Sequence, residues 1–121
     1  MATDKRSRLR RTAAVVAVSL LGLAGCAGES VDRTITVASV DGAPGLVPDE
    51  ITVHKDDEVL LVVKNTTDKT HGFRIEGYGI TELSDPTAPP LEVEFEATRG
   101  GTFRIMCHLH ETHQTGTLIV L

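Results

Sequence analysis

Only two cysteines and two methionines occur among the 121 residues of this chain. A long hydrophobic run is also missing, because the apolar segment near the N-terminus, residues 12–23, is shorter than the roughly 20 residues that cross a bilayer as a helix. No segment shows the periodicity of a long helix, and no internal repeat is visible. These absences argue against a membrane-spanning helix and leave short strands as the main structural elements.

The first 25 residues are expected to be an export signal. Basic residues from Lys5 to Arg11 precede the apolar run, and the string Leu23-Ala24-Gly25-Cys26 follows it. This string resembles the lipobox of bacterial lipoproteins, in which cleavage before the cysteine leaves it as the lipidated N-terminus. The resemblance implies an extracytoplasmic protein anchored to the cell membrane through lipidated Cys26. The alternative is a single-pass signal anchor with an incidental cysteine.

The charge balance narrows the range of partners. The leader contains five of the 12 basic residues and one of the 17 acidic residues, so its removal changes the net charge from −5 to −9. An acidic surface argues against nucleic acid and against direct adsorption on anionic lipid. Cys107 is then the only thiol left, which excludes a disulfide within the mature chain. Ligation of a metal would protect such a lone thiol from oxidation outside the cytoplasm.

Strand patterns separated by turn residues occupy the rest of the chain. Small and polar residues at 26–33 are expected to form a tether, and residues 34–121 a single domain. Glycines and prolines break the chain at 42–48, and residues 78–90 are expected to be irregular. Strands are expected at residues 34–38, 51–53, 58–64, 71–76, 91–96, 102–106 and 116–121. Such spacing predicts an all-β sandwich or barrel.

The stretch after residue 106 brings together the residues that carry chemistry. Cys107, His108, His110 and His113 stand on one short loop between two predicted strands. A thiolate with neutral imidazoles suits copper or zinc, and two histidines with one cysteine and a weak fourth ligand are typical of electron-transfer copper centres. A further histidine must come from another core strand, and His71 follows the apolar strand 58–64 after a short turn.

Several segments together resemble the cupredoxin family. They are residues 51–53, 57–59 and 62–65, His71, Gly101-Thr102-Phe103, Cys107-x2-His110 and residues 116–120. The similarity extends from about residue 51 to residue 121. It implies a Greek-key β-sandwich of about seven to eight strands that binds one copper ion and transfers single electrons. Carried over residue by residue, it assigns the copper ligands to His71, Cys107 and His110.

The weak axial ligand departs from the family pattern. Most cupredoxins place a methionine shortly after the loop histidine, whereas the methionines here are Met1 and Met106. Counting back from Gly116 by the Met-x-Gly ending of the family leads to Gln114, which is favoured. Counting forward by the short-loop spacing leads to His113. A glutamine would favour Cu(II), and a histidine would favour a more tetragonal copper or zinc.

A second departure concerns the number of copper ions. Residues 70–73 and 77–80 look like the dinuclear copper domains of nitrous-oxide reductase and cytochrome oxidase subunit II, which require two loop cysteines. Glu111 stands where the second cysteine would be, so the dinuclear centre is excluded. His108 is expected to point away from the metal, because it follows Cys107 directly. His54 is expected to be a surface residue.

The sequence therefore predicts a mononuclear copper protein that carries one electron and is not an enzyme, since no nucleophile–base arrangement is visible. Its expected partner is a redox protein, or a copper donor or acceptor, in the cell envelope. Two alternatives remain open at this point. One is a copper storage or delivery module without redox turnover, and the other is a metal-free interaction domain.

Overall fold

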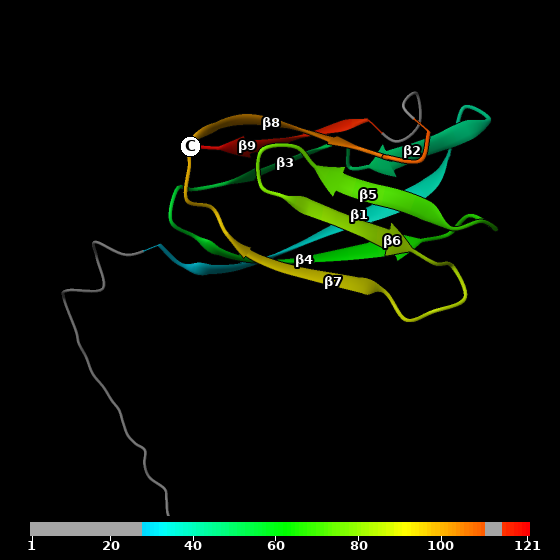
Figure 1. Ribbon diagram of the computed structural model, residues 1–121, viewed down its shortest axis with the longest axis horizontal. Helices are drawn as coiled ribbons and strands as arrows, with labels where there is room; N and C mark the ends of the chain where they lie inside the picture. The colour runs from blue at the N-terminus through cyan, green and yellow to red at the C-terminus, as the bar shows by residue number, and fades with distance from the viewer. Residues whose placement is uncertain (1–27, 111–114) are drawn as a thin grey trace, which may run out of the picture.

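The computed structural model describes residues 28–110 and 115–121, and within them the chain forms a sandwich of two β-sheets (Figure 1). No helix occurs among the described residues, and accordingly none that could cross a membrane. The strands are β1 (Ser30–Val40), β2 (Ala43–Val47), β3 (Glu50–Val53), β4 (Glu58–Asn65), β5 (His71–Ile75), β6 (Ile80–Ser84), β7 (Leu91–Glu96), β8 (Gly101–Met106) and β9 (Gly116–Val120). The predicted all-β sandwich is therefore confirmed.

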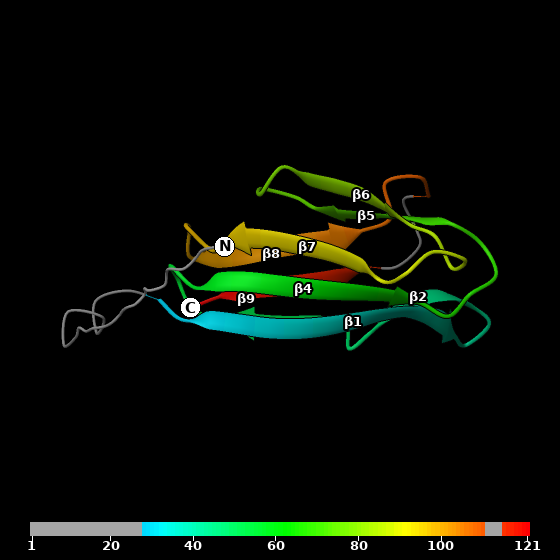
Figure 2. The ribbon, with the colours of Figure 1, turned by 90° about the horizontal axis from the view of Figure 1, so that it is seen from below.

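The two sheets lie face to face, and in Figure 2 the strands β1, β4 and β7 of one sheet lie in front of the strands of the other. The first sheet has the strand order β2-β1-β4-β7 and the second has the order β3-β9-β8-β5-β6. Strands β1 and β4 pair in parallel, as do β3 and β9, and the remaining neighbours are antiparallel. The pairings of β3 with β9 and of β1 with β4 link segments that are distant in the sequence. Each sheet is therefore held together in part by long-range contacts.

Period-two alternation explains how the strands build the core. In β4, the side chains of Val59, Leu61 and Val63 are buried while their neighbours are more exposed. In β7, Val93 is buried between exposed glutamates, so one face of this strand contacts the core and the other contacts water. Buried aliphatic side chains from both sheets, together with Phe73, form one continuous hydrophobic core. This core fixes the positions of the loops at both ends of the sandwich.

The structure corrects the expected boundaries in three places. Strand β1 begins at Ser30, so residues 30–33 belong to the domain and not to a tether. Residues 43–47 form β2, which pairs with β1 through a two-residue Asp41-Gly42 turn with φ angles of 52° and 84°. Residues 80–84, expected to be irregular, form β6 at the edge of the second sheet.

The first described residues are attached to the end of the sandwich where β1 and β4 begin. The buried carboxylate of Asp57 accepts hydrogen bonds from the backbone N–H groups of Glu29, at 3.0 Å, and His54, at 2.8 Å. These bonds hold the pKa of the Asp57 carboxyl below its usual value. Glu58 N–H in turn donates to the carbonyl of Glu29 at 2.8 Å. The predicted leader, residues 1–25, and Cys26 lie outside the described residues.

Candidate metal centre

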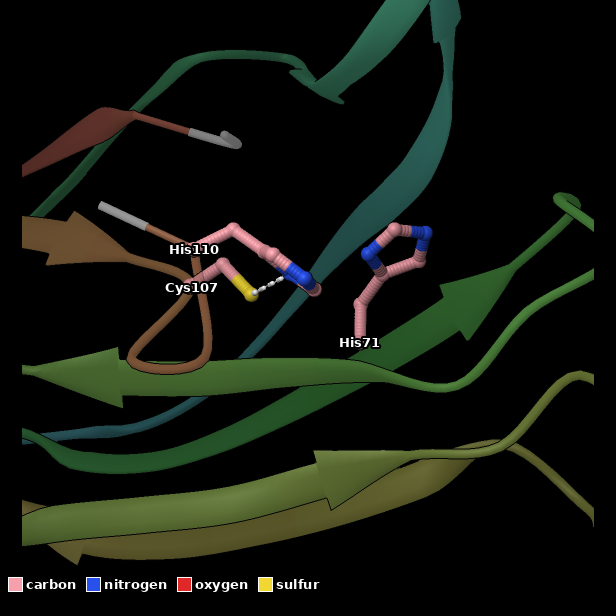
Figure 3. Close-up of side chains that lie close together, drawn as sticks. All are labelled: His71, Cys107 and His110. Atoms are coloured by element: carbon pink, nitrogen blue, oxygen red, sulfur yellow. Dashed lines mark hydrogen bonds between the residues drawn. The ribbon is translucent and has the colours of Figure 1, made fainter. Parts of the chain in front are cut away.

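Three of the predicted ligands meet at the opposite end of the sandwich. His71 is the first residue of β5, and Cys107 follows directly after the last residue of β8. His110 lies one turn beyond, and its backbone N–H donates to the carbonyl of Cys107 at 3.2 Å. Figure 3 shows the three side chains converging from these separate elements. Residues 36 positions apart in the sequence are thus brought to one point by the pairing of β5 with β8.

The distances between the three donor groups fit a single metal ion. One ligand atom each from His71, Cys107 and His110 lies within 4.8 Å of the others. The Cys107 Sγ and His110 Nδ1 atoms are 3.9 Å apart. A nitrogen and a sulfur bound to one ion at about 2.0 and 2.3 Å lie about 3.5–3.7 Å apart at the angles of a three- or four-coordinate site. The observed distance for this pair exceeds the required one by a few tenths of an ångström, and no pair in the cluster exceeds 4.8 Å.

The cluster is buried on one side and open on the other. Cys107 is fully buried and His71 is 4% exposed, whereas His110 is exposed. The backbone N–H of Gly72 donates a hydrogen bond to Cys107 Sγ at 3.2 Å. This bond links the start of β5 to the side chain of Cys107, directly after β8.

His108 is not part of the cluster, in agreement with the expectation that it points away. Its imidazole packs over Gly72, and its Nδ1 atom is buried without a hydrogen-bond partner among the described residues. A Cβ atom at position 72 would lie 2.6 Å from this Nδ1 and 3.0 Å from the backbone nitrogen of His108. Gly72 is therefore required by close packing, a role that the sequence did not reveal.

The remaining candidate residues divide into two groups. His113, Gln114 and Glu111 lie outside the described residues, so the axial ligand stays a prediction. His54 is exposed, as expected, and its Nδ1 lies 4.0 Å from Asp57 Oδ2 at the other end of the sandwich. Within the described residues, the grouping of potential metal ligands contains only His71, Cys107 and His110.

Comparison with known proteins identifies the family. A family model described as a cupredoxin-like domain matches residues 12–120. The chain therefore belongs to the family of cupredoxin-like domains. The donor set described above is consistent with the copper chemistry of this family, because a thiolate and imidazoles are ligands that copper accepts.

Solved structures with the same fold include proteins of different kinds. The metal-binding domain of the Cu(I)-exporting P-type ATPase CopA from Streptococcus pneumoniae D39 has 16% identity and a TM-score of 0.63, over 78% of this chain and 94% of that one. A purple cupredoxin from Nitrosopumilus maritimus has 14% identity and a TM-score of 0.56, over 74% and 100%. The copper nitrite reductase of Nitrosomonas europaea has 17% identity and a TM-score of 0.61, over 75% of this chain. This chain spans 41% of the length of that reductase.

Proposed function

We propose that this protein binds one copper ion through His71, Cys107 and His110 and transfers single electrons to and from it. The observation that carries the proposal is the convergence of the three donor groups within 4.8 Å at the end of a rigid sandwich. Copper changes its preferred geometry between Cu(I) and Cu(II), and ligands fixed by a packed scaffold limit this rearrangement. The copper would supply the redox chemistry, and the protein would supply a fixed ligand geometry.

The difference in exposure among the ligands supports electron transfer to a partner protein. The thiol of Cys107 is buried, and the exposed imidazole of His110 connects the site to the surface. Leu109, next to it in the turn, is 50% exposed. A partner docked on this turn would come close to the metal without opening the domain. An acidic protein surface favours a partner with basic groups around its docking site.

The anchoring of the protein belongs to the same proposal. Strand β1 begins at Ser30, at the end of the sandwich opposite to the metal cluster (Figure 1). A lipid attached at Cys26 would therefore hold the domain outside the cytoplasm with the copper site directed away from the membrane. This orientation leaves His110 accessible to a redox partner in the cell envelope.

The axial ligand, the choice of metal and the absence of catalysis are further parts of the proposal. We assign the axial position to Gln114, with His113 as the alternative, and copper as the metal in preference to zinc. The proposed protein is an electron carrier and not an enzyme. The exposed His110 also favours a second candidate, copper delivery, because a ligand at the surface can be exchanged for one from an acceptor protein.

Reconstitution of the purified domain with Cu(II) tests the proposal. We expect an intense visible thiolate-to-Cu(II) absorption band that bleaches with a reductant and returns on oxidation, with the metal retained. Cys107→Ser should abolish the band, whereas His54→Ala, a histidine at the opposite end, should leave it unchanged. Loss of copper on each reduction would favour delivery. Failure to bind copper or zinc would favour a metal-free interaction domain.

A further inference from the structure

A cavity adjoins the metal cluster on its exposed side. It has a volume of about 480 Å³ and lies between the β1–β2 turn, the segment before β5 and the turn after β8. Its lining includes Gly42, Ala43, Pro44 and Lys69 together with two of the proposed copper ligands, His71 and His110. A molecule inside this cavity would thus touch the same imidazoles that hold the metal.

The size of the cavity sets what can enter it. One water molecule occupies about 30 Å³ in the liquid, and sites for small molecules have volumes of about 300–1,000 Å³. The cavity is therefore large enough for a small ligand with its hydration water. A small molecule is the occupant that this volume fits.

We propose that the cavity admits a small anion that would bind the copper ion in place of the weak axial ligand. This inference rests on the proposed copper site. A Cu(II) ion with one thiolate ligand keeps a net positive charge, and a bound cation is the largest local charge in such a site. Lys69 adds a second positive charge at the wall of the cavity, and Asp68, also at the wall, opposes it. The metal is thus the main attraction and Lys69 a smaller one.

Binding of an anion would change the redox behaviour of the carrier. Anionic oxygen and nitrogen donors prefer the harder Cu(II) to Cu(I), so the anion stabilises the oxidised form. We consider an anion that binds only the Cu(II) form and is present at ten times its dissociation constant. Its binding multiplies the equilibrium ratio of Cu(II) to Cu(I) protein by about 11. For a one-electron couple this factor lowers the reduction potential by about 60 mV. The site would act as an anion-sensitive electron carrier.

Titration of the Cu(II) protein with sodium azide, at constant ionic strength, tests the inference. We expect azide to change the thiolate-to-Cu(II) band with saturation and to lower the reduction potential. Ala43→Leu fills part of the cavity and should weaken azide binding at least about ten-fold. Ala88→Leu places the same side chain on an exposed loop outside the cavity and should change the dissociation constant less than about two-fold.

A pair of lysine substitutions gives an independent readout. Lys69→Gln should weaken azide binding about two- to five-fold, the range expected from loss of one exposed charge. Lys55→Gln, an exposed lysine at the opposite end of the sandwich, should have no such effect. A copper band that azide leaves unchanged would overturn this inference and leave the copper site intact. Equal effects of Ala43→Leu and Ala88→Leu would also overturn it. Absence of the copper band itself would overturn both proposals.

Discussion

Replacement of Gly72 by alanine tests how the start of β5 and the turn after β8, which contribute the ligands, are held together. The backbone N–H of Gly72 donates to Cys107 Sγ at 3.2 Å, and the ring of His108 covers the position where a side chain would start. The added Cβ would lie 2.6 Å from His108 Nδ1, 2.7 Å from Cε1 and 3.0 Å from the backbone nitrogen. The ring can rotate away, but the backbone nitrogen can move only with the whole loop.

The magnitude follows from the cost of excess volume in a packed region. Overpacking typically destabilises a folded protein by about 1–3 kcal/mol. For a domain of this size, this cost corresponds to a decrease in Tm of roughly 5–20 °C. Because the loop after β8 must move, the hydrogen bond from Gly72 to Cys107 should also lengthen. The thiolate-to-Cu(II) band of the copper-loaded variant should therefore shift, since that bond withdraws electron density from the sulfur.

Chemical denaturation of the metal-free protein measures the first effect and absorption spectroscopy measures the second. Gly100→Ala is a matched control, because a Cβ there would approach only the carbonyl oxygen of Val120, at an ordinary 3.5 Å. This control should change the free energy of unfolding by less than about 1 kcal/mol. Equal behaviour of the variants at positions 72 and 100 would refute the reasoning.

A double substitution locates the cause of the cost. His108→Ala removes the ring but leaves the backbone nitrogen in place. The cost of Gly72→Ala should therefore be smaller in the His108→Ala background than in the wild type, without vanishing. The same cost in both backgrounds would show that contact with the imidazole is not responsible.

Two further predictions concern the rest of the domain. Phe73→Ala should lower the free energy of unfolding by about 3–5 kcal/mol, because the ring is fully buried. Phe95→Ala should lower it less, because that ring is half-buried. Urea denaturation measures both. The lowered pKa of Asp57 stabilises the fold at pH values above the unfolded pKa of about 3.8, and this contribution is lost as the pH falls through the folded value. Asp57→Asn should therefore lower the Tm at pH 7, and the difference in Tm from the wild type should shrink in acid. The variant Asp56→Asn, at the exposed neighbouring residue, should show no such convergence. Thermal melts between pH 2.5 and 7 compare the variants.

Much of the fold follows from alternation that the sequence shows directly. Strand β7 places apolar residues at every second position, β4 contains a continuous apolar run, and seven of the nine strands in the described residues were expected from patterns of these kinds. The end of one strand at Met106 and the start of another at His71 also indicated where the ligands would meet. Local pattern was sufficient there because core burial fixes which face of each strand is inside.

The sequence did not indicate β2 and β6, which lie at sheet edges, or the first residues of β1, which extend beyond the core. Strand β2 contains Pro44, which lacks a backbone N–H and is tolerated because β2 is an edge strand. Strand β6 buries only Ser84 and therefore has no apolar alternation. The first residues of β1 are held by parallel pairing with β4, a contact that spans 28 sequence positions. Parallel pairing of this kind leaves no local signal.

Two features of the candidate site were also inaccessible from the sequence. The packing of His108 on Gly72 joins the turn after β8 to the start of β5, and the cavity beside the cluster is formed by three separate segments. The first depends on the pairing of β5 with β8, and the second on the arrangement of the two sheets. The sequence could propose the ligands by residue type and spacing, but the access route to the metal required the structure.

A crystal structure of the copper-loaded protein, with an anomalous difference map recorded at the copper absorption edge, tests the central claim most directly. We predict one peak within about 2.0–2.3 Å of a nitrogen of His71, the sulfur of Cys107 and a nitrogen of His110. A copper peak outside this cluster, such as one at the exposed His54, would contradict the proposed site.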